Sequence, residues 1–150
     1  MEAHLNRHFV EMLRELSAAG AELLIVGAHA LAAHGYVRGT VDFDIWIRPT
    51  QANAERVMRA LVNFGAPLLD LTVDDCARPD TIYQIGVEPL RIDIITSITA
   101  VEFDDAWASR LMTRIDGEEY PVIGKADLIR NKRATGRLKD LADVEELERM

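Results

Sequence analysis

The chain has 150 residues, the usual size of one domain, so a multi-domain protein is not expected. Apolar residues make up 49% and charged residues 28%, a composition that supports a folded core and excludes a largely disordered chain. The net charge is -8, from 17 Lys and Arg against 25 Asp and Glu. A surface this acidic repels a phosphate backbone, so broad, sequence-independent nucleic-acid binding is disfavoured.

The cysteine content and the N-terminal residues indicate where the protein works. Cys76 is the one cysteine, which excludes an intramolecular disulfide framework and a cysteine-based zinc cluster. The charged residues Glu2, Arg7 and Glu11 are unlike a signal peptide, and no apolar run approaches the roughly 20 residues needed to cross a bilayer. We expect a cytoplasmic protein without a membrane partner.

Apolar periodicity predicts the elements of the chain. Helical spacing predicts helices over residues 4–19, 28–34, 50–64, 99–110, 125–135 and 140–149. Apolar runs and alternation predict strands over 23–26, 41–47, 81–87, 90–96, 111–115 and 120–123, a further strand at 68–71 and a short helical turn ending at Pro79. Strands and helices in this mixed order predict a single α/β (α+β) domain with a mixed sheet, a core over about residues 21–124 and C-terminal helices over 125–149.

The most informative segment is Asp42-Phe43-Asp44 in the strand predicted over 41–47. Residues two apart on a strand point to the same side, so both carboxylates project together, roughly 6 to 7 Å apart, while Phe43 enters the core. Like charges at this separation repel unless a cation lies between them, and Mg²⁺ prefers carboxylate oxygens completed by water and substrate phosphates. The alternative is an ordinary solvated strand face.

A third carboxylate, Asp93, lies in the apolar strand predicted over 90–96. An unpaired charge among aliphatic residues is costly, which favours a partner for Asp93. If this strand neighbours the strand at 41–47, three carboxylates converge. The alternative is a buried ion pair with Arg91, which lies on the same strand face.

Two further features suit an anionic ligand. Gly27 joins a buried strand to a helix, where free backbone N–H groups suit a phosphate, although a tight turn explains a single glycine equally well. Lys132 falls on the core-facing side of its predicted helix, where a lysine either reaches the rim or meets an anionic partner. Residues 125–139 carry six basic residues against Asp127 alone, so this helix is locally basic.

The ordered set of motifs resembles the nucleotidyltransferase superfamily with the polymerase-β-like fold, in particular its small bacterial members. These include minimal nucleotidyltransferases and those of abortive-infection and other toxin–antitoxin systems. The resemblance covers about residues 23–147 and rests on Val26-Gly27-Ala28, Arg38-x-Thr40-x-Asp42-x-Asp44, Asp93, and the ending from Asp127-Leu128-Ile129 through Lys132 to Arg137-x-Lys139-Asp140-x-x-Asp143.

The resemblance implies roles for these residues. Asp42 and Asp44 would hold two Mg²⁺ ions around a nucleoside triphosphate (NTP), and Asp93 would share a metal and help to deprotonate the attacking hydroxyl. Gly27 and Ala28 would form the loop around the β and γ phosphates. Lys132 and Arg38 would supply positive charge to the triphosphate, and Thr40 would orient the turn before the strand at 41–47.

Three functions remain open from the residues. The first is Mg²⁺-dependent transfer of a nucleotidyl group from an NTP to a hydroxyl of a small molecule, a tRNA end or a protein. The second is a non-catalytic binding module that acts through a partner, as in a toxin–antitoxin pair. Ala28 favours it, since the family's loop usually reads Gly-Gly or Gly-Ser and alanine offers no hydroxyl. The third is a metal-dependent phosphohydrolase, which lacks a recognisable set of histidine ligands.

Overall fold

The structure is a computed structural model that describes residues 5–37, 42–87 and 89–150. Its strands are β1 (Leu23–Val26), β2 (Asp42–Ile47), β3 (Ile82–Ile85), β4 (Arg91–Ile95), β5 (Leu111–Ile115) and β6 (Glu118–Val122). Its helices are α1 (Arg7–Ala18), α2 (Gly27–Ala33), α3 (Gln51–Phe64), α4 (Val73–Cys76), α5 (Phe103–Ala108), α6 (Lys125–Thr135) and α7 (Leu138–Arg149). No helix in this part of the chain is long and apolar enough to span a membrane.

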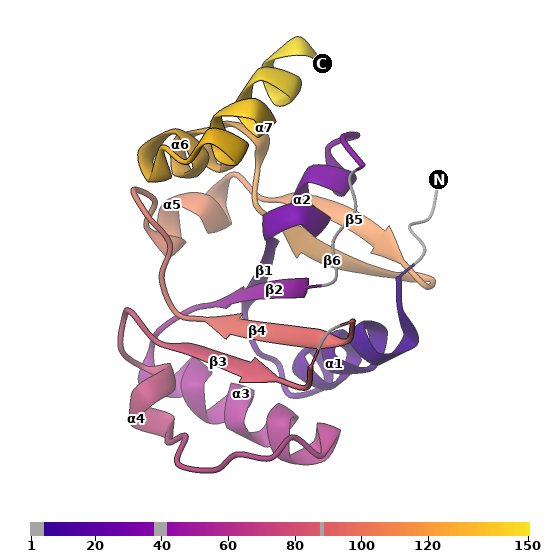
Figure 1. Cartoon of the computed structure of the whole chain (residues 1–150). Coiled ribbons are helices and arrows are strands. Elements are labelled where there is room, and N and C mark those ends of the chain that lie inside the picture. Colours follow the sequence, from indigo (N-terminus) through magenta and orange to yellow (C-terminus); the bar gives the residue numbers. More distant parts are fainter. Residues whose placement is uncertain (1–4, 38–41, 88) are drawn as a thin grey trace.

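The six strands form one mixed sheet in the order β3-β4-β2-β1-β6-β5. The β3–β4 and β5–β6 pairs are antiparallel, which confirms both predicted hairpins. β1 pairs antiparallel with β2 and parallel with β6, while β2 pairs parallel with β4. The predicted fold class, a single α/β domain with a mixed sheet and flanking helices, is therefore confirmed (Figure 1).

The two faces of the central strands meet different helices. On β2, Phe43 is buried and its ring stacks on Phe9 of α1 at 4.9 Å between centroids. Trp46 points to the opposite face, since its position differs from Phe43 by an odd number, and it packs edge-on against Phe103 of α5. In Figure 1, α1 and α3 gather at one end of the view and α5, α6 and α7 at the other. The face that carries Asp42, Asp44 and Trp46 is thus opposite to α1.

Two expected elements differ from the structure. Residues 68–71 form no strand: Leu69 is 88% exposed and has φ 52°, a left-handed conformation that a strand does not accept. The helix expected from Thr99 begins only at Phe103, because Ile98 and Val101 form a β-bridge and Ala100 adopts φ 68°. Both stretches form turns, whose local backbone geometry apolar periodicity does not reveal.

Candidate active site

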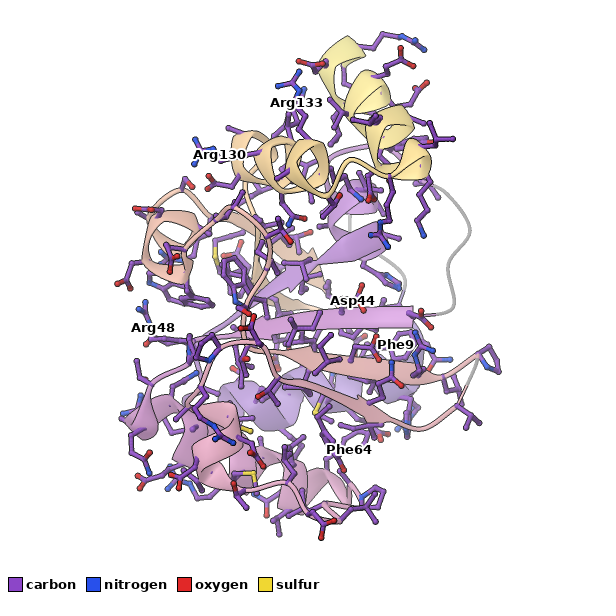
Figure 2. All side chains as sticks on the ribbon, turned by 60° about the vertical axis from the view of Figure 1, so that its left-hand side comes forward. Phe9, Asp44, Arg48, Phe64, Arg130 and Arg133 are labelled. Carbon is purple, nitrogen blue, oxygen red and sulfur yellow. The ribbon has the colours of Figure 1, made fainter. Side chains whose placement is uncertain are left out.

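The structure brings the three predicted aspartates together at the centre of the sheet. Asp44 on β2 and Asp93 on β4 are register partners on adjacent parallel strands, and the preceding pair is Asp42 with Arg91. Because alternate residues of a strand share a face, all four side chains project to the face that carries Trp46. The expected convergence of three carboxylates is confirmed, with Asp44 on the central strand β2 (Figure 2).

Arg91 neutralises two of these carboxylates. Its Nη2 donates to Oδ2 of Asp42 at 2.6 Å, and its Nε lies 3.2 Å from Oδ1 of Asp93. The ion pair between Asp93 and Arg91, which the sequence left as an alternative to convergence, therefore occurs together with it. One guanidinium faces three carboxylates in this cluster, which leaves an excess of negative charge.

Asp44 is affected both by its burial and by this excess of negative charge. Burial raises the pKa of Asp44 to about 7, helped by the negative charges of Asp93 and Asp42 and opposed by Arg91. Burial also raises the pKa of Asp93, and Arg91 partly offsets this effect. Asp44 therefore carries a proton for part of the time near neutral pH. A second cation beside it would favour the ionised carboxylate.

Gly27 brings the backbone directly against Asp44. Val26, the last residue of β1, pairs with Asp44, and Gly27 follows with φ 70°. A Cβ placed on Gly27 would lie 2.3 Å from Oδ2 of Asp44, closer than any real Cβ contact. Only glycine therefore allows the chain to turn from β1 into α2 against this carboxylate.

The residues after Gly27 belong partly to the core. Ala28 is half-buried, and His29 packs edge-on against Phe9 and Phe43 with centroid separations of 5.8 and 4.9 Å. Burial lowers the pKa of His29, against the effect of a backbone hydrogen bond at Asp42. His29 is thus a packing residue that contacts Phe43 on the sheet face opposite to the aspartate cluster.

The donor set suits a divalent cation, but the cluster is not a preformed cage. Carboxylate oxygens are the ligands that Mg²⁺ prefers. Within residues 5–37, 42–87 and 89–150, no three His, Cys, Asp or Glu side chains are arranged to hold a metal ion. Arg91 lies between Asp42 and Asp93, so metal binding by these residues requires its guanidinium to move.

Lys132 pairs with two carboxylates outside the cluster formed by Asp42, Asp44 and Asp93. Its Nζ lies 3.4 Å from Oδ1 of Asp140 and 3.0 Å from Oδ2 of Asp143, and all three side chains are at most 8% exposed. Burial opposes ionisation of Asp140, but hydrogen bonds from Thr135 and Arg137 and the charge of Lys132 hold its pKa below the usual value. Lys132 therefore meets an anionic partner within the protein, where α7 packs on α6.

Ion pairs, two of them local and one between α6 and α7, compensate part of the basic charge of residues 125–139. Arg133 pairs with Glu148 at 2.6 Å, Arg137 with Asp140 at 2.6 Å, and Arg130 with Asp127 at 3.6 Å. The opposing carboxylates come from Asp127 on α6 and from α7. The three arginine side chains stay more than half exposed, so a contact of this helix with phosphates stays a prediction. Arg38 and Thr40 lie outside the described residues.

Two features of the structure were not predicted from the sequence. One is the pairing of Lys132 with Asp140 and Asp143, for which a signal existed: carboxylates three apart share one face of a helix. The other is a pocket between Arg48 and Phe103, built from four separate segments, for which no local pattern is diagnostic.

Comparison with known proteins gives structural matches. No known family profile and no curated protein sequence matches the chain. Three solved structures have the same arrangement, at 12–14% sequence identity. The antibiotic-resistance factor ANT(2'')-Ia has a TM-score of 0.64 over 93% of this chain and 80% of its own. The lincosamide antibiotic adenylyltransferase LnuA, solved with lincomycin, has 0.62 over 96% of both chains. TM1012 of Thermotoga maritima, which carries a provisional nucleotidyltransferase name, has 0.57 over 97% and 94%.

The fold is that of the nucleotidyltransferases. These matches confirm the fold expected from the motifs, and at this level of identity they show the fold alone. A fold leaves function to the site residues of the individual chain, so the activity of this protein depends on what its aspartates can bind.

Proposed function

We propose that this protein is a Mg²⁺-dependent nucleotidyltransferase that moves a nucleotidyl group from an NTP to a hydroxyl acceptor. The observation that carries the proposal is the register pairing of Asp44 with Asp93, beside Asp42, on one face of the sheet. The fold and the raised pKa of Asp44 support it, since the cluster lacks positive charge. We expect the reaction to take place in the cytoplasm.

The aspartates would hold the metal. Asp42, Asp44 and Asp93 would bind two Mg²⁺ ions together with the triphosphate, whose charge the ions neutralise during transfer. Arg91 would release Asp42 and Asp93 and remain beside them as a source of positive charge. The backbone N–H groups at Gly27 and Ala28 would approach the phosphates, because Gly27 lies directly against Asp44. Arg38, Thr40 and Lys132 remain candidates for contacts with the nucleotide.

The transfer itself requires in-line positioning. The acceptor hydroxyl oxygen forms a bond to the α-phosphorus as the bond from that phosphorus to the bridging oxygen of the β-phosphate breaks, and pyrophosphate leaves. The hydroxyl proton passes to the carboxylate of Asp93 and then to water. The acceptor would be a small molecule, a tRNA end or a protein side chain.

Binding and transfer of labelled NTPs test the proposal. We expect calorimetry to show Mg·NTP binding, and Asp42→Asn and Asp44→Asn to abolish its metal-dependent part. Asp70→Asn removes an exposed carboxylate elsewhere and serves as the matched control. Label from one NTP should reach an acceptor among small molecules, bulk tRNA or proteins. Absence of Mg·NTP binding to the folded wild type at millimolar ligand would contradict the proposal.

A second function, a non-catalytic module that acts through a partner protein, is favoured by Arg91. The guanidinium already neutralises Asp42 and Asp93 without a metal, and Ala28 offers no hydroxyl to a phosphate. A toxin–antitoxin partner is one such case. Mg·NTP binding without label transfer, together with co-purification of a specific partner protein, would favour this function over catalysis.

A further inference from the structure

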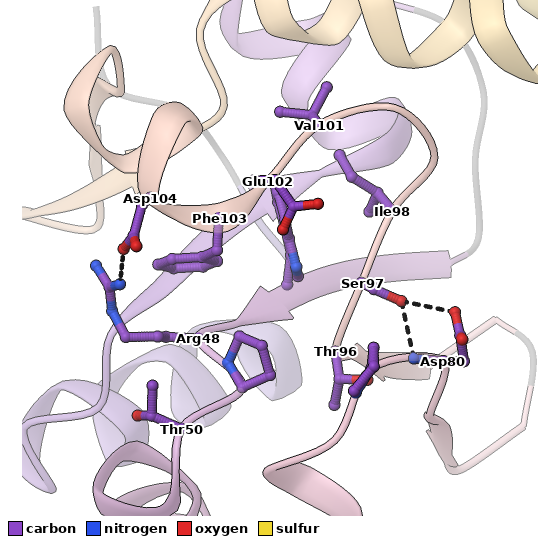
Figure 3. Close-up of a pocket in the computed structure, with 13 residues that line it drawn as sticks. Arg48, Thr50, Asp80, Thr96, Ser97, Ile98, Val101, Glu102, Phe103 and Asp104 are labelled. Atoms are coloured by element: carbon purple, nitrogen blue, oxygen red, sulfur yellow. Dashed lines mark hydrogen bonds and ion pairs between the residues drawn. The ribbon is translucent and has the colours of Figure 1, made fainter.

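A pocket of about 390 Å³ lies on the same face of the sheet as the aspartate cluster (Figure 3). Trp46 lines it and is two residues along β2 from Asp44, so the two sites are neighbours on one strand face. Thr96, Ser97 and Ile98 line it where β4 ends, and Phe103 lines it from α5. The volume falls within the range of small-molecule sites.

The charge of the pocket is negative. Its one lining arginine, Arg48, is already paired with Glu22 at 3.0 Å and with Asp104, and its guanidinium carbon lies 4.7 Å from the centroid of Phe103. Two further lining carboxylates, Asp80 and Glu102, have no ion pair among the described residues. A triphosphate is therefore disfavoured in this pocket, and a cation is favoured.

The carboxylate of Asp80 is held in place by hydrogen bonds to Ser97. The backbone N–H of Asp80 donates to Oγ of Ser97 at 2.8 Å, and the Ser97 hydroxyl donates to Oδ1 of Asp80 at 3.1 Å. These bonds, drawn in Figure 3, fix one acceptor at the rim before any ligand arrives. A fixed acceptor lowers the entropy cost of binding a donor.

One of the lining residues, Trp46, has a buried donor without an acceptor. Trp46 is 1% exposed, and its Nε1 has no hydrogen-bond partner within the residues that the structure describes. A buried donor without an acceptor destabilises the protein. A ligand oxygen that reaches this N–H after a small shift of the indole would offset the cost. Ile98, Val101 and Phe103 supply an apolar wall beside it.

We propose that this pocket binds the acceptor substrate and that the acceptor is a hydroxylated organic cation, such as an amino sugar. The carboxylates of Asp80 and Glu102 bind its ammonium groups, a ligand oxygen accepts from Trp46, and a hydroxyl extends along the strand face toward Asp44 and Asp93. The last point rests on the proposed nucleotidyl transfer, whereas cation binding does not depend on it.

Nuclear magnetic resonance titration without nucleotide tests the pocket. The probes are the disaccharide of glucosamine, which carries amines, and cellobiose, which has a closely similar skeleton with hydroxyls in their place. The reporter is the indole N–H of Trp46, one of the two tryptophans of the chain. We expect the amine-bearing disaccharide to shift Trp46 at millimolar concentration, with an affinity that falls as salt rises, and cellobiose to bind more weakly.

Charge-neutral variants separate the pocket from a general acidic surface. The double variant Asp80→Asn, Glu102→Gln should weaken binding of the glucosamine disaccharide about tenfold. Asparagine tolerates the left-handed φ of 63° at position 80, so the turn is preserved. Glu119→Gln removes an exposed charge on β6, which β1 and β2 separate from β4 in the sheet, and should leave binding unchanged.

Three results would overturn the pocket proposal. They are absence of any Trp46 shift with the glucosamine disaccharide, equal affinity for cellobiose, and unchanged affinity in the double variant. Adenosine that shifts Trp46 equally in wild type and double variant would instead assign the pocket to a nucleobase. Loss of Mg·NTP binding in a protein that still binds the disaccharide would overturn the proposed transfer and leave the cation site intact.

Discussion

The contact between Gly27 and Asp44 links the backbone of one strand–helix turn to the charge of the proposed metal site. Gly27 has no side chain, so the β1–α2 turn reaches Asp44, whose pKa burial raises to about 7. The closeness excludes water from one side of Asp44 and contributes to its raised pKa. A substitution at either residue should therefore affect both stability and ligand binding.

Gly27→Ala should destabilise the fold and reduce Mg·NTP binding. Its Cβ would meet Oδ2 of Asp44 at 2.3 Å, and alanine at φ 70° adds backbone strain, for a combined loss of about 2–4 kcal/mol in the free energy of unfolding. Gly65→Ala is the matched control, because φ is 89° there but no atom lies within 4 Å of the position that a Cβ would take. It should lose only about 1 kcal/mol. Equal losses in urea denaturation would contradict the contact.

Asp44→Asn should stabilise the metal-free protein at alkaline pH. The folded-state pKa of Asp44, about 7, lies above its unfolded value of 3.8, so the wild type loses stability as pH rises through this interval. Asparagine does not ionise, and the variant should gain about 1–3 kcal/mol relative to wild type between pH 5 and pH 8, after allowance for partial exposure.

Denaturation in urea with a chelator present, at both pH values, measures this difference. Asp70→Asn, at an exposed position, is the control for the removal of one carboxylate. A difference between Asp44→Asn and wild type that stays constant from pH 5 to pH 8 would refute the raised pKa.

At the scale of elements, two pairings determine what this face of the protein can do. The parallel pairing of β2 with β4 brings Asp42, Asp44 and Asp93 together across 49 residues of chain. The packing of α7 on α6 takes Lys132 into a buried ion-pair cluster with Asp140 and Asp143. The first pairing builds the proposed metal site, and the second uses a lysine that the resemblance assigns to the nucleotide.

Lys132→Met should strongly destabilise the α6–α7 pair. It leaves Asp140 and Asp143, each 2% exposed, without the ammonium between them, and loss of one partner of a buried ion pair costs about 3–5 kcal/mol. Lys139→Met, at an exposed position, should change the free energy of unfolding by less than about 0.5 kcal/mol. If Lys132→Met folds with normal stability and loses only NTP binding, Lys132 is a nucleotide ligand that the free protein does not need.

At the scale of the whole molecule, one core connects all layers. Its buried side chains run from Phe9 and Leu16 on α1 through the sheet to Leu128 on α6 and Leu147 on α7. The net charge of -8 is distributed unevenly over the molecule. Arg133 and Arg137 near the C-terminus are paired with carboxylates, whereas the pocket and the aspartate cluster have more carboxylates than basic side chains. The acidic total therefore includes the two groups of carboxylates on which both proposals rest.

Because the core is continuous, the chain should unfold as one unit. Tryptophan fluorescence, from Trp46 on β2 and Trp107 on α5, and far-ultraviolet circular dichroism, which reports on all helices, should give the same midpoint and slope in urea. Coincidence would support a single domain over residues 1–150. Two separated transitions would indicate instead that residues 125–149 form a unit of their own.

Much of the fold could be predicted from local sequence patterns. The period-2 alternation of residues 41–47 and the apolar run at 23–26 mark strands because each strand must bury one or both faces. The turn at 68–71 could not be predicted, because Leu69 adopts a left-handed backbone conformation that leucine rarely takes.

For the site, sequence alone determined which carboxylates share a strand face, because a strand has a fixed period of two and Asp42 and Asp44 obey it within one segment. It also determined that Asp93 needs a partner, because an isolated charge among aliphatic residues is costly. Only the tertiary structure decided that Arg91 bridges Asp42 and Asp93, that Asp44 lies against Gly27, and that Lys132 pairs with carboxylates of α7. These contacts depend on which strands and helices become neighbours, and that choice is made by packing of the whole core, which no local period encodes.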